Sequence, residues 1–415
     1  HNTSEGALTK SPTGGLNLYA GFKTGICIVE GEGNVLLGNH SGIGYTTGSH
    51  NISIGSTVGP QTCGASGCDN ISIGRSTGIN ITSGGLNVLI GRCTGISQTT
   101  AFSNVLLGSC VGRSLTGSTN IGIGVKALDG VITGTYNVAI GYRAGRSQYS
   151  ASLGVPDATQ NIAIGYDAGD TAIQGGQNQN IFLGFKAGDG LVQGVSTSTA
   201  CKNNNDNILI GSNTGDQSYV CGLYCRNVLI GDRAGNSSIG VGVGCDYVNN
   251  VLLGTLAGKS YAGTCNIFIG AYAGCSAASH TIPRSTGIAN IGIGVSIQMP
   301  DRFGSNQLAI GQTSKYWIVG DQNFNVGIGT TIPTNAVTSG NTQKLAVGIL
   351  TSHRVFTQIL SFTSGVGPNT TGQATTSGAN IAIGDTFTGN TFNNAVVNYR
   401  NISIGNCAGC CLNNG

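Results

Sequence analysis

The sequence predicts an all-β chain, folded as a parallel β-solenoid or β-roll of about 18 short coils, and three observations support that fold class. A short motif built on asparagine, small aliphatic residues and glycine recurs along the 415 residues. The aliphatic residues within the motif alternate with a period of two, which is the period of a strand. Glycine is abundant, with 71 residues, and only 8% of residues are charged, as is typical of short strands joined by tight turns.

Two nearly identical copies define the motif, "TYNVAIGYRAG" at 135–145 and "TQNIAIGYDAG" at 159–169. We take the glycine of the Ile-Gly or Leu-Gly pair as an anchor, which gives 18 copies. Asparagine stands four residues before the anchor in every copy except one, where Gln307 replaces it. The shortest spacings, 16 to 17 residues, are too short for a βαβ crossover of roughly 30 residues. They suit one coil of a solenoid, and longer spacings contain inserted loops.

The spacing of the copies divides the chain into four segments. Residues 1–33 are expected to be an N-terminal lead-in, and residues 34–330 the solenoid repeat array. Residues 331–379 interrupt the array and predict an insertion or a small β side domain, after which residues 380–415 continue it. Because the chain starts at His1 and not at a methionine, we expect it to be a piece of a longer or processed polypeptide.

The constant asparagine predicts a hydrogen-bonded ladder. Coils of a solenoid stack at about 4.8 Å, so identical amide side chains on successive coils can bond to one another as they do in cross-β stacks. The alternative is that asparagine serves only as a turn former, since it tolerates left-handed backbone conformations. The predicted ladder residues are Asn34, Asn51, Asn70, Asn87, Asn104, Asn120, Asn137, Asn161, Asn180, Asn207, Asn227, Asn250, Asn266 and Asn290.

The residue two before the anchor is never charged and is often large and apolar, which predicts that both faces of each strand are buried. We expect the residues three and one before the anchor, such as Val138 and Ile140, to fill the coil, and the residue between them to meet another chain. The alternative is a wide single solenoid with a second internal layer. An apolar stripe on an array of stacked coils predicts lateral association, with a trimer or a dimer as the expected closed assembly. The predicted inter-chain stripe comprises Leu36, Leu89, Leu106, Phe182, Leu209, Leu229, Leu252 and Phe268.

Fourteen cysteines raise three alternatives, namely a metal site, disulfides and buried free thiols. A structural zinc site needs four closely placed ligands, and no such set of cysteines is evident, so we expect no metal. Loop disulfides are possible in an oxidising compartment, and the candidates bracket two insertions, Cys63 with Cys68 and Cys221 with Cys225. Cys93 and Cys110 occupy equal positions in adjacent coils and are expected to be a thiol pair.

Charge and composition argue against several function classes. The net charge is only +3 and no Lys/Arg cluster occurs, so we expect no nucleic-acid partner. No run of 18 apolar residues is present, so no membrane insertion is expected. The five histidines make no pair at metal-ligand spacing and have no nucleophile context. We therefore expect no cofactor, no catalytic residue and no enzymatic activity.

The repeat core resembles two kinds of protein. "NVAIGYRAG" and "NIAIGYDAG" are similar to the head repeats of trimeric autotransporter adhesins; that resemblance implies left-handed parallel β-rolls with three chains around an axis. "NIFLGFKAG" and "NIFIGAYAGC" resemble arrays in tail fibres of marine and cyanobacterial phages. The segment from Asn325 to Leu350 looks like one that precedes a C-terminal chaperone domain in such fibres, although two more copies follow it here and no chaperone domain is visible.

These resemblances lead to a functional expectation. The chain is expected to be a structural fibre protein, namely a phage or virion tail fibre that attaches to a host surface. Its expected partners are copies of itself, a host cell-surface glycan or protein receptor, and other virion proteins, and its expected location is the virion or the cell surface. The alternatives are the head of a bacterial trimeric adhesin and a subunit of an extracellular structural filament.

Overall fold

A computed structural model describes residues 15–146, 159–170, 178–189, 205–215, 224–236, 247–261, 263–275, 287–301, 303–313, 315–323 and 325–329, together with the backbone of four further strands. The chain comprises two compact units, His1–Ile349 and Leu350–Gly415. Every regular element in the described part is a strand. Most of the residues predicted as an insertion, 331–379, lie outside the described ranges, and the division between the two units falls among them.

Most strands are three residues long and coincide with the motif. Their bounds are β1 (Ala7–Lys10), β2 (Leu16–Ala20), β3 (Val35–Leu37), β4 (Ile52–Ser56), β5 (Ile71–Arg75), β6 (Val88–Arg92), β7 (Val105–Leu107), β8 (Ile121–Ile123), β9 (Val138–Ile140), β10 (Ile162–Ile164), β11 (Ile181–Leu183), β12 (Ile208–Ile210), β13 (Tyr224–Cys225), β14 (Val228–Ile230), β15 (Tyr247–Val248), β16 (Val251–Leu253), β17 (Ile267–Ile269), β18 (Ile291–Ile293), β19 (Leu308–Gln312), β20 (Lys315–Gly320), β21 (Val326–Ile328), β22 (Leu345–Val347), β23 (Ile381–Ile383) and β24 (Ile402–Ile404).

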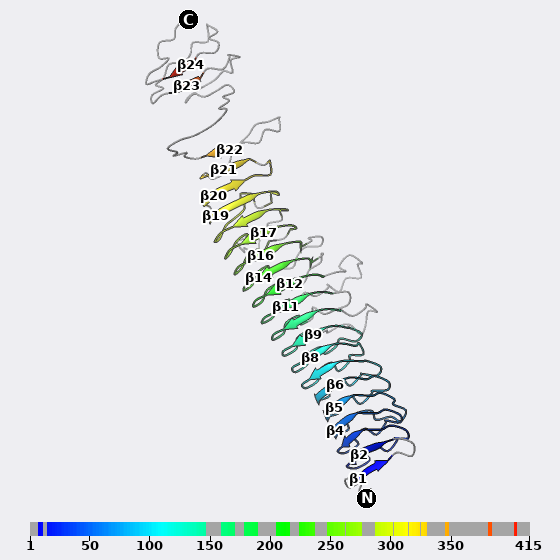
Figure 1. The fold of residues 1–415 in the computed structure, drawn as a ribbon. Helices are drawn as coiled ribbons and strands as arrows, with labels where there is room; N and C mark the ends of the chain where they lie inside the picture. Colours follow the sequence, from blue (N-terminus) through cyan, green and yellow to red (C-terminus); the bar gives the residue numbers. More distant parts are fainter. Residues whose placement is uncertain are drawn as a thin grey trace, which may run out of the picture. The chain divides into compact units, whose positions relative to one another are not determined.

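One parallel sheet organises the first unit. The motif strands from β2 to β19 pair in sequence order and in register, each one coil above the last (Figure 1). At the N-terminal end β1 pairs antiparallel with β2. At the other end β20 reverses direction between β19 and β21, and β22 then pairs parallel with β21. The sheet confirms the predicted parallel β-solenoid.

The predicted number of about 18 stacked turns was too high. The continuous parallel array ends at β19, because the strand that follows it, β20, runs antiparallel. The copy anchored at Gly329 comes after this reversal. The copies anchored at Gly384 and Gly405 contain β23 and β24, which form a separate two-stranded parallel sheet in the second unit.

One turn of the array escaped the sequence pattern. The segment "NLYAG", Asn17 to Gly21, has the asparagine and the glycine of the motif but carries Ala20 where the other copies have isoleucine or leucine. Its strand β2 pairs in parallel register with β3. An isoleucine or leucine directly before the anchor glycine is therefore not required for a turn of this fold.

The core of each coil is narrow and centres on the middle residue of the strand. Ala139 in β9 is fully buried and so is Ala144, whereas Val138 and Ile140 on either side of Ala139 are partly exposed. After the anchor glycine the chain folds back over the side of the strand that carries the middle residue. The residue three after the anchor, here Ala144, therefore packs in the same interior as Ala139.

The predicted inter-chain stripe was therefore wrong. Its eight members are at most 1% exposed within the single chain, so they form the interior of the coil and cannot contact another chain: Leu36, Leu89, Leu106, Phe182, Leu209, Leu229, Leu252 and Phe268. The physical reason is the direction in which the chain turns after the anchor glycine. This turn places the coil interior on the side of the strand that carries these residues. The large members fit because glycine four after the anchor lies against them; a Cβ on Gly42 would lie 2.7 Å from a methyl carbon of Leu36.

Candidate functional site: an outward aliphatic sheet face and its corners

The residues three and one before each anchor form a continuous aliphatic surface, which we call the outward face. Strands β3 to β12, β14 and β16 to β19 each contribute two Ile, Val or Leu side chains to it, in register from one strand to the next. Charged side chains are absent from these two positions in all fifteen strands. The sequence identified these residues but assigned them to the interior.

The outward face is partly exposed in the single chain. Ile121, Ile164 and Ile293 are between 37% and 39% exposed, and the other members are partly buried or similarly exposed. Trp317 on β20, the one tryptophan of the sequence, is 69% exposed. Monomeric soluble proteins rarely expose a contiguous apolar patch larger than a few hundred Å². A face built from two aliphatic side chains on each of fifteen strands exceeds that size.

The predicted asparagine side chains form a ladder at the start of the strands. The Oδ1 atom of Asn34 accepts hydrogen bonds from the backbone nitrogen of Asn51 at 2.9 Å and from its Nδ2 at 3.1 Å. The Nδ2 of Asn51 also donates to the carbonyl oxygen of Gly67 on the following turn at 2.9 Å. The same side-chain bond, between 2.9 and 3.3 Å, joins each successive asparagine from Asn17 to Asn266.

The ladder residues are not the turn formers. All fourteen predicted asparagines are at most 1% exposed, and none of them has a positive φ. The residue immediately before the asparagine takes the left-handed conformation instead, as Tyr136 does before Asn137 with φ 59°. The asparagine therefore satisfies buried backbone groups between coils, which is the ladder interpretation.

A tyrosine interrupts the ladder near its C-terminal end. The Nδ2 of Asn290 donates to the hydroxyl of Tyr261 at 2.8 Å, and the hydroxyl donates to the carbonyl of Gly287 at 3.1 Å. Burial raises the pKa of Tyr261 to about 12, and these two hydrogen bonds limit the increase. One turn later Gln307 takes the asparagine position, and its backbone nitrogen donates to the Oδ1 of Asn290 at 2.9 Å.

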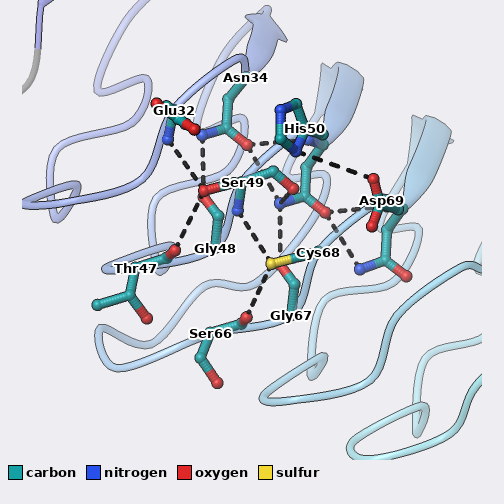
Figure 2. A network of polar contacts seen from close by, with 12 residues as sticks. Glu32, Asn34, Thr47, Gly48, Ser49, His50, Ser66, Gly67, Cys68 and Asp69 are labelled. Atoms are coloured by element: carbon teal, nitrogen blue, oxygen red, sulfur yellow. Dashed lines mark hydrogen bonds and ion pairs between the residues drawn. The ribbon is translucent and has the colours of Figure 1, made fainter. Parts of the chain in front are cut away.

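One corner of the early turns gathers a hydroxyl, an imidazole, a thiol and a carboxylate, from Ser49, His50, Cys68 and Asp69 (Figure 2). The Nδ1 of His50 lies 3.9 Å from the Oδ1 of Asp69, and both side chains are more than half exposed, so this pair is weak. The thiol of Cys68 donates to the carbonyl of Ser66 and accepts from the backbone nitrogen of Ser49. Its polar contacts are thus made with the backbone, whereas an activated nucleophile needs a hydrogen bond to a base.

The corner that follows the anchor glycine carries most of the ion pairs. Arg113 makes two hydrogen bonds, at 2.9 and 2.8 Å, to Asp129 on the next turn, and these raise the pKa of Arg113. Arg146 is paired in the same way with Asp170, at 2.8 and 3.2 Å, and the NH2 nitrogen of Arg143 lies 3.2 Å from Asp170. Cations and carboxylates on successive turns therefore neutralise one another here.

The cysteines pair differently from the prediction. Cys63 forms a disulfide with Cys27, 36 residues earlier, and Cys68 keeps a free thiol. The predicted bridge between Cys63 and Cys68 was therefore wrong, because stacking brings Cys63 beside a residue that is distant in the sequence. Cys225 is a buried free thiol, and its predicted partner Cys221 lies outside the described residues. Cys93 and Cys110 are free thiols, as expected.

Removal of the Cys27–Cys63 disulfide is expected to loosen the first turns of the solenoid. The bridge closes a loop of 36 residues, which corresponds to about 3 to 4 kcal/mol of stability in the chain-entropy treatment. Thermal melting of Cys63→Ser and of the reduced wild type should show this loss. Cys68→Ser removes a thiol outside the bridge and is the matched control. Peptide mapping of the unreduced protein that linked Cys63 to Cys68 would contradict the pairing.

Comparison with protein-family models, with curated proteins and with solved structures gave no match to this chain. In the described ranges there is no helix of the length and hydrophobicity needed to cross a membrane. Most of the loops inserted between the later strands lie outside the described residues. The outward face and its two polar corners are therefore the surfaces from which a function can be argued.

Proposed function

We propose that the chain is a structural fibre protein, namely a phage or virion tail fibre that attaches to a host surface and works as a homo-oligomer. The observation that carries the proposal is the outward face, since it is aliphatic on fifteen successive strands and partly exposed in one chain. A surface without charges offers few features for selecting a different partner. A second copy of the same chain presents an identical face, so self-association buries both.

A trimer is the expected assembly. Closed symmetry buries the outward face of every copy and leaves no open apolar surface. Resemblance of the repeat core to the heads of trimeric autotransporter adhesins favours three chains over two. An oxidising location, such as the virion or the cell surface, agrees with the Cys27–Cys63 disulfide.

The role proposed for the chain is attachment and support, not catalysis. The stacked turns form a scaffold, and its corners and the loops inserted between strands would then contact the host glycan or protein receptor. Release of reducing sugar from a host polysaccharide by the purified protein would contradict this part of the proposal.

Light scattering in solution tests the assembly. Wild-type protein is expected to have three chain masses, and the variant Ile162→Asp/Ile164→Asp is expected to have one. Both positions are at least a third exposed in the single chain, so the substitutions place charge in the interface and leave the coil interior unchanged. The control Ser83→Asp/Thr100→Asp adds two carboxylates at exposed positions outside the outward face and should keep the wild-type mass. A monomeric wild type would overturn the proposal.

A further inference from the structure

The turns from β5 to β8 have an unbalanced charge. Residues 70–128 contain four basic side chains, Arg75, Arg92, Arg113 and Lys126, and no acidic residue. All four lie within five residues after an anchor glycine, so they project from the same corner of the solenoid. Since Arg113 is paired with Asp129 on the next turn, the excess positive charge of this corner comes from Arg75, Arg92 and Lys126, in a protein whose net charge is only +3.

Two of these arginines are stacked directly on each other. Arg75 and Arg92 are partners in the register of β5 and β6, and Ser56 in β4 is the partner of Arg75 on the other side. Adjacent strands lie about 4.8 Å apart. Like charges that are direct neighbours in a sheet destabilise it. Both arginines are exposed, and neither has a hydrogen bond or ion pair to another side chain in the described part of the chain.

Several other cations at this corner are paired with a carboxylate. Arg146 there binds Asp170 on the following turn, and Lys186 lies 3.7 Å from Asp189. Arg113 likewise has Asp129 as its partner. Arg75 and Arg92 differ from these cations because they lie beside each other in register and have no carboxylate as a partner in the described part of the chain.

We propose that Arg75 and Arg92 bind the sulfate or carboxylate groups of an acidic polysaccharide. A guanidinium presents a planar fork of donors that matches such an anion in a bidentate geometry. Two guanidinium groups separated by one strand spacing, about 4.8 Å, can bind sulfate or carboxylate groups on one sugar unit or on two successive units. An anion between the arginines also removes the repulsion that the stacked pair has in the free protein.

The neighbours of the pair favour a sugar over a nucleic acid. Ser56 and Ser109 occupy the same position as the arginines on the two flanking turns, and their hydroxyls can bond to sugar hydroxyls. No aromatic residue occupies that position on these four turns, whereas proteins that bind single-stranded nucleic acid stack bases on aromatic rings. This inference rests on the proposed attachment function and specifies the chemistry of the receptor.

Binding measurements with defined polymers test the proposal. The probes are dextran sulfate, polygalacturonate, uncharged dextran and a DNA duplex, each titrated calorimetrically at about 0.1 M salt. Wild-type protein is expected to bind dextran sulfate or polygalacturonate, and which of them binds tells sulfate recognition from carboxylate recognition. It is not expected to bind dextran. The variant Arg75→Gln/Arg92→Gln should lose affinity by about tenfold or more, since each charged hydrogen bond contributes on the order of 1.5 kcal/mol.

A matched variant separates a local site from a general effect of charge. Arg226→Gln/Arg233→Gln removes two exposed arginines from other turns and changes the net charge equally, so its affinity should stay within about twofold of wild type. Equal losses in the two variants would overturn the proposal, and so would tighter binding of the DNA duplex than of either polysaccharide. Absence of binding by wild-type protein that still shows three chain masses would overturn this inference and leave the proposed fibre function intact.

Discussion

The variant Gly91→Ala is expected to lose the stacking between β6 and β7, with a loss of more than about 4 kcal/mol in the free energy of unfolding. Gly91 has a φ of 137°, a conformation that costs an L-residue about 1 to 3 kcal/mol. A Cβ at this position would also overlap the carbonyl oxygen of Gly108, the anchor of the next turn. Relief of that overlap requires the two turns to separate, which breaks their shared hydrogen bonds. Hydrogen exchange of the β6 and β7 amides measures the loss locally.

Gly64 supplies the control for this experiment. It also has a positive φ, 114°, but a Cβ there would meet no atom within 4 Å. The variant Gly64→Ala therefore has the cost of the conformation without the overlap, and it should destabilise the fold by only about 1 to 3 kcal/mol. Equal effects of the two substitutions would show that close stacking of the anchor glycines does not limit the fold.

The variant Asn87→Ala is expected to destabilise the neighbouring turns by about 3 kcal/mol or more. The Oδ1 of Asn87 accepts hydrogen bonds from the backbone nitrogen and the Nδ2 of Asn104, at 3.0 and 3.3 Å. Its Nδ2 donates to the Oδ1 of Asn70 at 3.0 Å and to the carbonyl of Ala101 at 2.8 Å. Alanine leaves the backbone nitrogen of Asn104 and the carbonyl oxygen of Ala101 buried without these partners, and each such group costs about 1 to 3 kcal/mol. The Oδ1 of Asn70 keeps the backbone nitrogen of residue 87, and the Nδ2 of Asn104 keeps the carbonyl of Gly117.

Asn80 is the matched control because it is an exposed asparagine one turn earlier. The variant Asn80→Ala should leave the urea midpoint and the hydrogen exchange of β5 to β7 unchanged. In Asn87→Ala the amide of Asn104 should exchange faster than in wild type, since it has lost its acceptor. Full protection of that amide in the variant would show that the ladder does not hold successive turns together.

The repeated motif was sufficient to predict the solenoid and the position of its ladder. Asparagine at one place in each copy, as at Asn51 and Asn70, can form side-chain bonds only if the copies stack in register. The anchor glycines predicted the corners, because the backbone conformation at these positions disfavours any other residue. The prediction was wrong at the two ends of the array. The turn at Asn17 was missed, and the copies after β19 were wrongly counted as part of one array.

The period of two could not identify the inner face of the strands. It shows that Ala139 and its neighbours Val138 and Ile140 point to opposite sides, but it is symmetric with respect to inside and outside. Both sets of side chains are apolar here, so polarity did not distinguish them. The direction in which the chain turns after Gly141 makes the decision, because it brings Ala144 against Ala139 and leaves the other two on the outward face.

The strand positions, the corners and the ladder thus follow from the repeat pattern, since these depend on contacts between equivalent residues of successive repeats. The folded chain was needed to show which apolar face lies outside the coil, which cysteine Cys63 meets, and that Arg75 and Arg92 have no carboxylate beside them. These features depend on the direction of each turn and on contacts between residues far apart in the sequence. A repeat pattern does not contain the direction of each turn or these distant contacts, because it describes a single repeat and not the contacts between repeats.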